Sequence, residues 1–163
     1  MVHHQNKGAQ SQNKVNWAPP PMGTLKFNFD GACDVKRGVC GLGIVFRDHQ
    51  GHLKGALAVP QVGNLPPRSV EALALLHGLQ FAAHVGFTNI DIEGDALSVI
   101  DTLHESSEDL SYEGHLIEEI EFLIKSFPSY SSHFVRREGN EIAHRLAKEV
   151  LKVKIEDSIE GTG

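Results

Sequence analysis

Three acidic side chains stand where one segment of the sequence gives way to the next, and together they could bind metal. Asp30 closes an alternating segment, Glu71 lies early in a helical segment, and Asp95 follows a short apolar run. Taken singly, they suit a turn, a helix dipole and a helix N-cap. Brought together, three carboxylates repel one another and need a cation or shared protons. Oxygen ligands suit Mg²⁺ or Mn²⁺, which can assist phosphodiester hydrolysis.

The elements that must position these residues begin with three strand-like segments. Leu25, Phe27 and Phe29 alternate with polar residues up to Asp30, which gives a period of two. Residues 39–46 are rich in β-branched residues and glycine, and residues 52–59 follow after the turn RDHQG. The pattern predicts an antiparallel meander.

Helical and strand-like segments then alternate along the chain. A helix is predicted from Ser69 to Val85, stopped by Gly86, and a strand over 88–93. The remaining predicted segments are a helix from Asp95 to about 104, a helix at 112–125, a strand at 131–136 and a helix capped by Asn140. The order βββ-α-β-α-α-β-α predicts an α/β fold, with a five-stranded mixed sheet and helices on its faces. If the first and fourth strands are neighbours, Asp30 and Asp95 come close and Glu71 reaches them from the crossing helix.

Two helices carry apolar stripes that should face the core. In the predicted helix from Ser69 the stripe is Leu73, Leu76, Leu79 and Ala83, and in the last helix it is Ile142, Leu146 and Val150.

Length and composition predict one domain. A chain of 163 residues suits a single domain, which we place at 24–154 between a flexible, Pro-rich leader at 1–23 and a loose tail at 155–163. No apolar run is long enough for a membrane helix, and the polar start lacks a signal-peptide core. We therefore expect a soluble, unsecreted protein of the nucleus or cytoplasm. The spacing of Cys33 and Cys40 predicts reduced thiols.

Charge is distributed unevenly along the chain. The formal net charge of −6 argues against a generally basic nucleic-acid binder. Residues 91–122 hold eleven Asp and Glu and no Lys or Arg, whereas residues 133–154 hold six Lys and Arg against three Glu. The asymmetry is compatible with a nucleic-acid enzyme.

Four motifs in order resemble the ribonuclease H family. They are Asp30-Gly31-Ala32 at the end of the first strand, Glu71-Ala72 in a helix, Glu93-Gly94-Asp95 after a strand, and Asn140-x-x-Ala143-x-x-Leu146-Ala147 in the last helix. The segments WAPPPMGTLKFNFDGA, RDHQG and FVRREGNEIAHRLAK are similar to plant reverse-transcriptase-like ribonuclease H domains, which occur alone or at the end of non-LTR retroelement (retrotransposon) polyproteins. The resemblance spans about Trp17 to Leu151.

The resemblance implies a ribonuclease-H-like fold and a hydrolase that cuts the RNA strand of RNA–DNA hybrids with two Mg²⁺ or Mn²⁺ ions. Asp30 and Asp95 would bridge the metals, and Glu71 would complete the site near the attacking water. His144 falls at the family's fourth, usually acidic, ligand position and counts among the catalytic and metal residues. Arg136, Arg137 and Asn140 would contact nucleic acid. We expect a monomer, with fusion to or derivation from a reverse-transcriptase polyprotein left open.

Some departures from the family keep a second hypothesis open. His144 removes a negative charge from the site, the mobile Gly-His loop before the last helix is absent, and the region ESSEDLSYEGH is acidic where some members grip the hybrid with basic residues. The alternative is a catalytically weak or inactive nucleic-acid-binding or scaffold domain. A third, an exonuclease suggested by His144-x₄-Glu149, lacks the Asp-x-Glu that such enzymes carry on the first strand.

Overall fold

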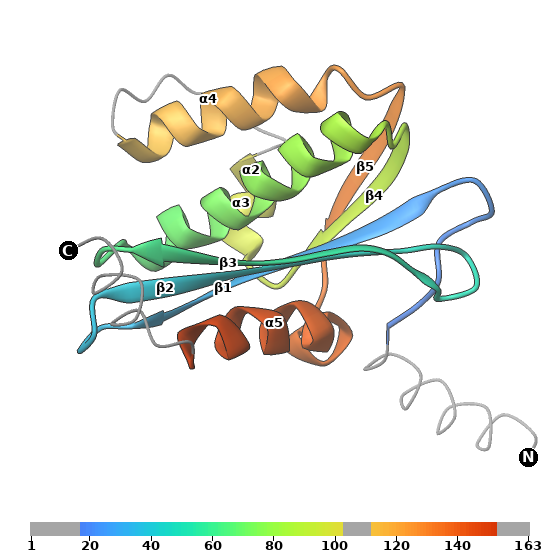
Figure 1. Cartoon of the computed structure of the whole chain (residues 1–163). Coiled ribbons are helices and arrows are strands. Elements are labelled where there is room, and N and C mark those ends of the chain that lie inside the picture. Colours follow the sequence, from blue (N-terminus) through green and yellow to red (C-terminus); the bar gives the residue numbers. More distant parts are fainter. Residues whose placement is uncertain (1–16, 103–111, 153–163) are drawn as a thin grey trace, which may run out of the picture.

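The computed structural model describes residues 17–102 and 112–152, which form a five-stranded sheet with helices on both faces (Figure 1). The strand order is β3-β2-β1-β4-β5. β1 and β2 pair antiparallel, as do β2 and β3, whereas β1 and β4 and then β4 and β5 pair parallel. The elements are β1 (Leu25–Asp34), β2 (Val39–Arg47), β3 (Leu53–Val62), α2 (Pro67–Val85), β4 (Asn89–Gly94), α3 (Leu97–Thr102), α4 (Tyr112–Ile124), β5 (Ser129–Phe134), a 3₁₀ turn (Arg137–Asn140) and α5 (Glu141–Leu151). The predicted order of strands and helices is confirmed.

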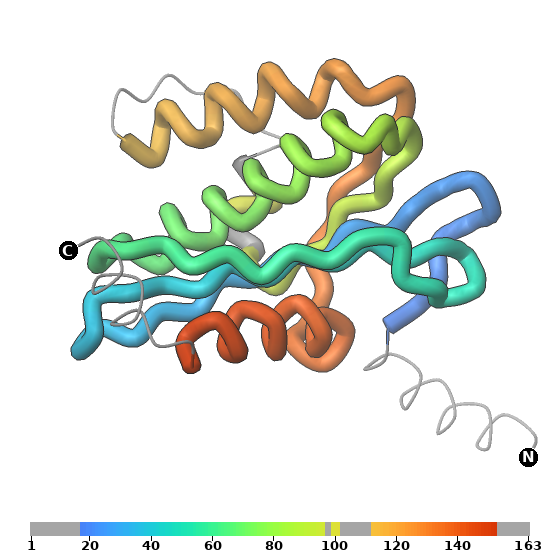
Figure 2. The backbone as a smooth tube through the Cα atoms, in the orientation of Figure 1, coloured from blue at the N-terminus to red at the C-terminus, as the bar shows by residue number. Residues whose placement is uncertain are grey.

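Helix α2 lies in the middle of the larger core, between the sheet and α4 (Figure 2). Its predicted stripe of Leu73, Leu76 and Leu79 is buried, but Ala82 is buried in place of Ala83. The helix begins at Pro67, before the predicted Ser69, because proline fits the first turn of a helix. None of the described helices is both long and apolar enough to cross a membrane.

Helix α5 lies alone on the opposite face of the sheet and approaches β2 closely (Figure 1). A Cβ atom at Gly41 or Gly43 would lie 2.0 Å from a backbone oxygen of α5, that of Ala147 or Ala143. The two glycines therefore let the helix backbone rest directly on the strand. The predicted stripe is wrong at Ile142, which is 42% exposed, because the close approach favours alanines on the buried side.

The described end of the predicted leader, which begins at Trp17, contacts the first two strands of the sheet. The Trp17 ring centroid lies 3.9 Å from the Arg47 guanidinium, and its Nε1–H donates to Asn28 Oδ1 at 3.1 Å. The Lys26 ammonium donates to the backbone oxygen of Ala18 at 2.7 Å. These contacts stabilise the segment although it has no hydrophobic periodicity. The rest of the leader, the tail at 155–163 and the acidic loop at 105–111 lie outside the described residues.

Cys33 and Cys40 form a disulfide, which corrects the prediction of reduced thiols. The β1–β2 register places the two residues directly opposite each other, with their Cα atoms 4.0 Å apart. The alternating pattern predicts a first strand that ends at Asp30, whereas β1 continues to Asp34 before the chain turns. The spacing of two cysteines does not show that they are cross-strand partners, and this is why the pairing was missed.

The contact between β2 and α5 generates a stability prediction. We expect Gly43→Ala to lower the free energy of unfolding by about 3 kcal/mol, because the backbone atoms facing it cannot move aside easily. Gly139→Ala is the control, since a Cβ there meets its nearest neighbour at an ordinary 3.6 Å. Urea unfolding of both variants measures the difference, and equal losses would contradict the close-packing account.

Candidate metal centre

Asp30, Glu71 and Asp95 converge at one end of the sheet. β1 and β4 are parallel neighbours in which Phe29 pairs with Gly94, so the next residue of each chain segment is a carboxylate. Glu71 comes from the first turns of α2, which passes close to β1 because Gly31 leaves room for Val70. One oxygen from each of the three carboxylates lies within 4.8 Å of the others. The condition that the first and fourth strands be neighbours is therefore met.

Burial sets the electrostatics of these three groups. Asp30 is only 1% exposed, and burial followed by the charge of Asp95 raises its pKa above the usual range. Burial, with the nearby charges of Asp30 and Asp95, raises the pKa of Glu71 to about 9. Without a cation, Glu71 therefore holds a proton at neutral pH and can donate it toward Asp30.

Each of the three carboxylates has one oxygen held by a protein group. Glu71 Oε1 accepts the backbone N–H of Gly31 at 3.2 Å, and Asp95 Oδ2 accepts Arg137 Nε–H at 2.8 Å. Asp30 Oδ2 lies 2.7 Å from Nδ1 of His144. These contacts fix the orientation of the carboxylates before any ligand is bound.

Among the oxygens of Asp30, Glu71 and Asp95, two are buried and have no hydrogen-bond partner, namely Asp30 Oδ1 and Glu71 Oε2. A buried carboxylate oxygen without a partner is costly, and a shared proton between the two groups relieves only part of that cost. A hard divalent cation would satisfy both oxygens at once. The residues present therefore fit the binding of Mg²⁺ or Mn²⁺.

His144 lies beside the carboxylates but does not join the group of three. Its Nδ1 lies 2.7 Å from Asp30 Oδ2, and Arg137 Nη1 lies 3.1 Å from Nδ1 and 3.0 Å from Nε2. The role of His144 as a fourth metal ligand stays a prediction, because the guanidinium of Arg137 lies against both ring nitrogens in this arrangement.

The three residues predicted to contact nucleic acid are placed very differently. Arg136 is exposed just before the 3₁₀ turn, and Arg137 reaches back to Asp95. Asn140 is fully buried: its Nδ2 donates to the Phe29 carbonyl at 2.8 Å, and its Oδ1 accepts from Asn28 at 3.1 Å. Its amide thus supports the strand just before Asp30 rather than capping α5, and a contact with nucleic acid would require it to become exposed.

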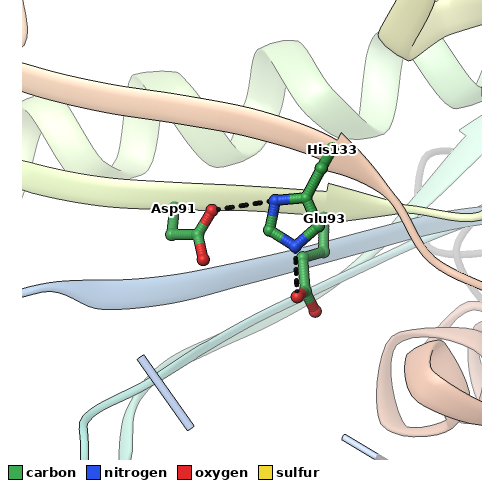
Figure 3. A group of neighbouring side chains, drawn as sticks. All are labelled: Asp91, Glu93 and His133. Carbon is green, nitrogen blue, oxygen red and sulfur yellow. Dashed lines mark hydrogen bonds and ion pairs between the residues drawn. The ribbon is translucent and has the colours of Figure 1, made fainter. Parts of the chain in front are cut away.

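A second polar cluster, missed by the sequence analysis, lies on the α5 side of the sheet. Figure 3 shows the His133 ring between Asp91 and Glu93, with Nδ1 3.2 Å from Asp91 and Nε2 2.6 Å from Glu93. The three could hold a metal by proximity alone, but Lys26 Nζ already lies 2.8 Å from Glu93 Oε1 and 3.7 Å from Asp91 Oδ2. With a lysine side chain only 6% exposed, we interpret the cluster as a buried ion network.

The network is joined to the metal centre by Asn28. Its Nδ2 contacts both Glu93 Oε2 and Asn140 Oδ1, each at 3.1 Å. The signal in the sequence was the polar face of the first strand, where Lys26 and Asn28 alternate with phenylalanines in the same way as Asp30 does.

The fold and the carboxylate group together define a ribonuclease-H-like domain. Ribonuclease H1 of the archaeon Halobacterium salinarum NRC-1 is similar at 26% identity and a TM-score of 0.71, covering 78% of this chain and 97% of its own. The N-terminal ribonuclease H domain of rv2228c from Mycobacterium tuberculosis has 18% identity and a TM-score of 0.71, covering 86% and 99%. LC11 ribonuclease H1, isolated from compost by a metagenomic approach and solved in complex with an RNA/DNA hybrid, has 17% identity and a TM-score of 0.64, covering 78% and 99%.

The family follows from the sequence match. Residues 28–150 match the family described as reverse transcriptase-like, and the chain belongs to that family. A comparison with curated proteins found no match. The fold predicted from the four motifs is confirmed, and the chain has the fold of ribonuclease H enzymes.

The raised pKa of Glu71 predicts how stability without metal depends on pH. The folded state favours protonated Glu71, so this contribution is fully present below the usual pKa of 4.5 and is lost as the pH rises toward about 9. In excess chelator, the wild type should lose free energy of unfolding between pH 5 and pH 9, and Glu71→Gln should lose much less. Urea unfolding across this range tests it, with Glu118→Gln on the exposed side of α4 as control. Equal pH slopes for the wild type and Glu71→Gln would be inconsistent with a buried, protonated Glu71.

The ion network predicts a large effect of removing its lysine. Lys26→Met leaves Glu93 and Asp91 without their cation, and we expect a loss of about 3–5 kcal/mol in the free energy of unfolding. Lys54→Met removes an exposed partner of Asp48 and should change stability far less. A mild effect of Lys26→Met, measured by the same denaturant titration, would argue for a cluster held together in another way.

Proposed function

We propose that this protein is a divalent-metal-dependent endonuclease that hydrolyses the RNA strand of RNA–DNA hybrids. The observation that carries the proposal is the group of three carboxylates with two buried, donor-free oxygens at the end of the sheet of a ribonuclease-H-like fold. The hybrid bound to LC11 ribonuclease H1, which has the same fold, supports this choice of substrate.

The proposed roles follow from how each side chain is held. Asp30 lies within β1 and Asp95 directly follows its parallel neighbour β4, so the two would hold two Mg²⁺ or Mn²⁺ ions together, and Glu71 would lie near the attacking water. When bound, such ions activate water and stabilise the departing oxygen. The contacts of the carboxylates with Gly31, His144 and Arg137 keep the oxygens oriented, which reduces the reorganisation needed on binding.

Arg136 and Arg137 are the proposed contacts to substrate phosphates at the mouth of the site. Contacts to phosphate and to the 2′-hydroxyl carry little sequence information, so we expect weak sequence preference. Because contacts of arginine with phosphate release condensed counter-ions, binding of the hybrid should weaken as salt rises.

The alternative, a weakly active or inactive binding or scaffold domain, is favoured by one specific observation. Arg137 and His144 occupy the place around Asp30 and Asp95 where a fourth acidic ligand would add negative charge. If these two groups do not give way, metal would bind poorly. Metal-dependent stabilisation of the folded protein therefore distinguishes the two functions.

The proposal also includes the evolutionary origin of the chain. The segments shared with plant-type domains support an origin in a non-LTR retroelement, alone or as part of a reverse-transcriptase polyprotein. We propose that the domain acts as a monomer in the nucleus or cytoplasm.

Cleavage of a labelled RNA–DNA hybrid at low salt with Mg²⁺ or Mn²⁺ tests the function. We expect internal cuts in the RNA strand, and a loss of about a hundredfold or more in Asp95→Asn because a metal-bridging oxygen is removed. Asp101→Asn makes the same chemical change at an exposed position of α3 and should cleave like the wild type. A folded wild type that cleaves with neither metal would exclude the nuclease and favour the binding domain.

A further inference from the structure

Arg137 brings a permanent positive charge into contact with the candidate metal centre. Its Nε donates to Asp95 Oδ2 at 2.8 Å, and its Nη1 lies 3.0 Å from His144 Nε2. His144 in turn contacts Asp30 at 2.7 Å. One guanidinium therefore contacts two of the residues predicted to bind metal: the carboxylate of Asp95 and both ring nitrogens of His144.

The burial of the participants shows which of them can move. The side chain of Arg137 is 55% exposed, whereas those of Asp95 and Asp30 are 9% and 1% exposed. The 3₁₀ turn that carries Arg137 ends in the buried Gly139 and Asn140, so its backbone is fixed while the arginine side chain has an open path to solvent. The carboxylates stay in place, and the arginine is the group free to leave.

The Arg137 guanidinium and a divalent cation compete for the position beside Asp95, because both are positively charged. Arg137 places one positive charge against Asp95 at the edge of the group of three carboxylates. A divalent ion among the carboxylates would bring two positive charges to the same place and would repel the guanidinium. At a separation of about 6 Å in water, that repulsion corresponds to about a tenfold change in affinity.

We propose that Arg137 is a displaceable counter-ion of the metal centre, which holds Asp95 and His144 in the metal-free protein and is released when metal binds. This inference rests on the proposed function, because it assumes that the carboxylates bind metal. A single movement of the arginine side chain frees an oxygen of Asp95 and the imidazole ring of His144. The released guanidinium is then available for a phosphate of the substrate, so metal binding and substrate binding are coupled through one residue.

The coupling has a consequence for metal preference. Nδ1 of His144 faces Asp30, and the ring loses its contacts with Arg137 when the guanidinium leaves, so the imidazole would become available beside the metal. Imidazole suits Mn²⁺ better than Mg²⁺, which prefers oxygen. Mn²⁺ is therefore the probe that reports most directly on the release of both groups.

Mn²⁺ titration by calorimetry at low salt, on the full chain without substrate, tests the inference. Arg137→Gln should bind Mn²⁺ about tenfold more tightly than the wild type, because the competing charge is gone. Arg145→Gln is the matched control: it makes the same change on α5, where the arginine pairs with Glu141 outside the centre, and its affinity should stay within about twofold of the wild type. Arg137→Lys, which retains the charge, should remain closer to the wild type than Arg137→Gln does.

The outcomes separate this inference from the proposed function. Equal or weaker Mn²⁺ binding by Arg137→Gln, in a wild type that does bind Mn²⁺, would overturn the counter-ion role and leave the nuclease intact. Tighter binding by Arg145→Gln as well would also overturn it, by showing a general effect of charge. No Mn²⁺ binding by a folded wild type or by Arg137→Gln would overturn the metal centre itself, and the inference with it. Circular dichroism of each variant establishes that it is folded.

Discussion

Repulsion among three carboxylates held close together is the constraint on which the rest of the structure depends. Asp30, Glu71 and Asp95 share a volume a few ångströms across, partly shielded from water, where like charges interact strongly. The chain does not relieve this by moving them apart, because Asp30 lies within β1, Asp95 directly follows the neighbouring β4, and Glu71 projects from a helix packed against these strands. The strain is met by protonation of Glu71, by one protein donor for each carboxylate and, in the proposed function, by metal.

The rest of the fold serves this placement from both faces of the sheet. On one face, α2 is buried under α4, which keeps Glu71 from moving away from the strands. On the other face, α5 rests on the glycines of β2 and brings His144 to Asp30, while Asn140 fixes the strand next to it. The ion network around Lys26 extends the same polar face, so the residues that support Asp30 are themselves held by contacts that reach the edge strand β5.

The sequence predicted the element order and the three carboxylates because both depend on local patterns. Strand alternation, helix stops and the four motifs of the resemblance are all visible in short segments. What it missed depends on contacts between distant segments. The disulfide depends on the register between β1 and β2, and the burial of Asn140 depends on the position of β1 against α5. The contact of Trp17 with the sheet depends on Arg47, which lies at the end of β2. The stripe of α5 was misread at Ile142 because the glycines that draw the helix toward β2 lie a hundred residues earlier.

Anomalous diffraction from crystals soaked in Mn²⁺ tests most directly that these carboxylates form a metal centre. Within residues 17–102 and 112–152, two groups of side chains could attract the ion, and only the group of Asp30, Glu71 and Asp95 has buried oxygens without a hydrogen-bond partner. We predict a peak within about 2.2 Å of an oxygen of Asp30, and of Glu71 or Asp95, with Arg137 turned away from Asp95. A peak only beside Asp91, Glu93 and His133, or no peak at either group, would contradict the account.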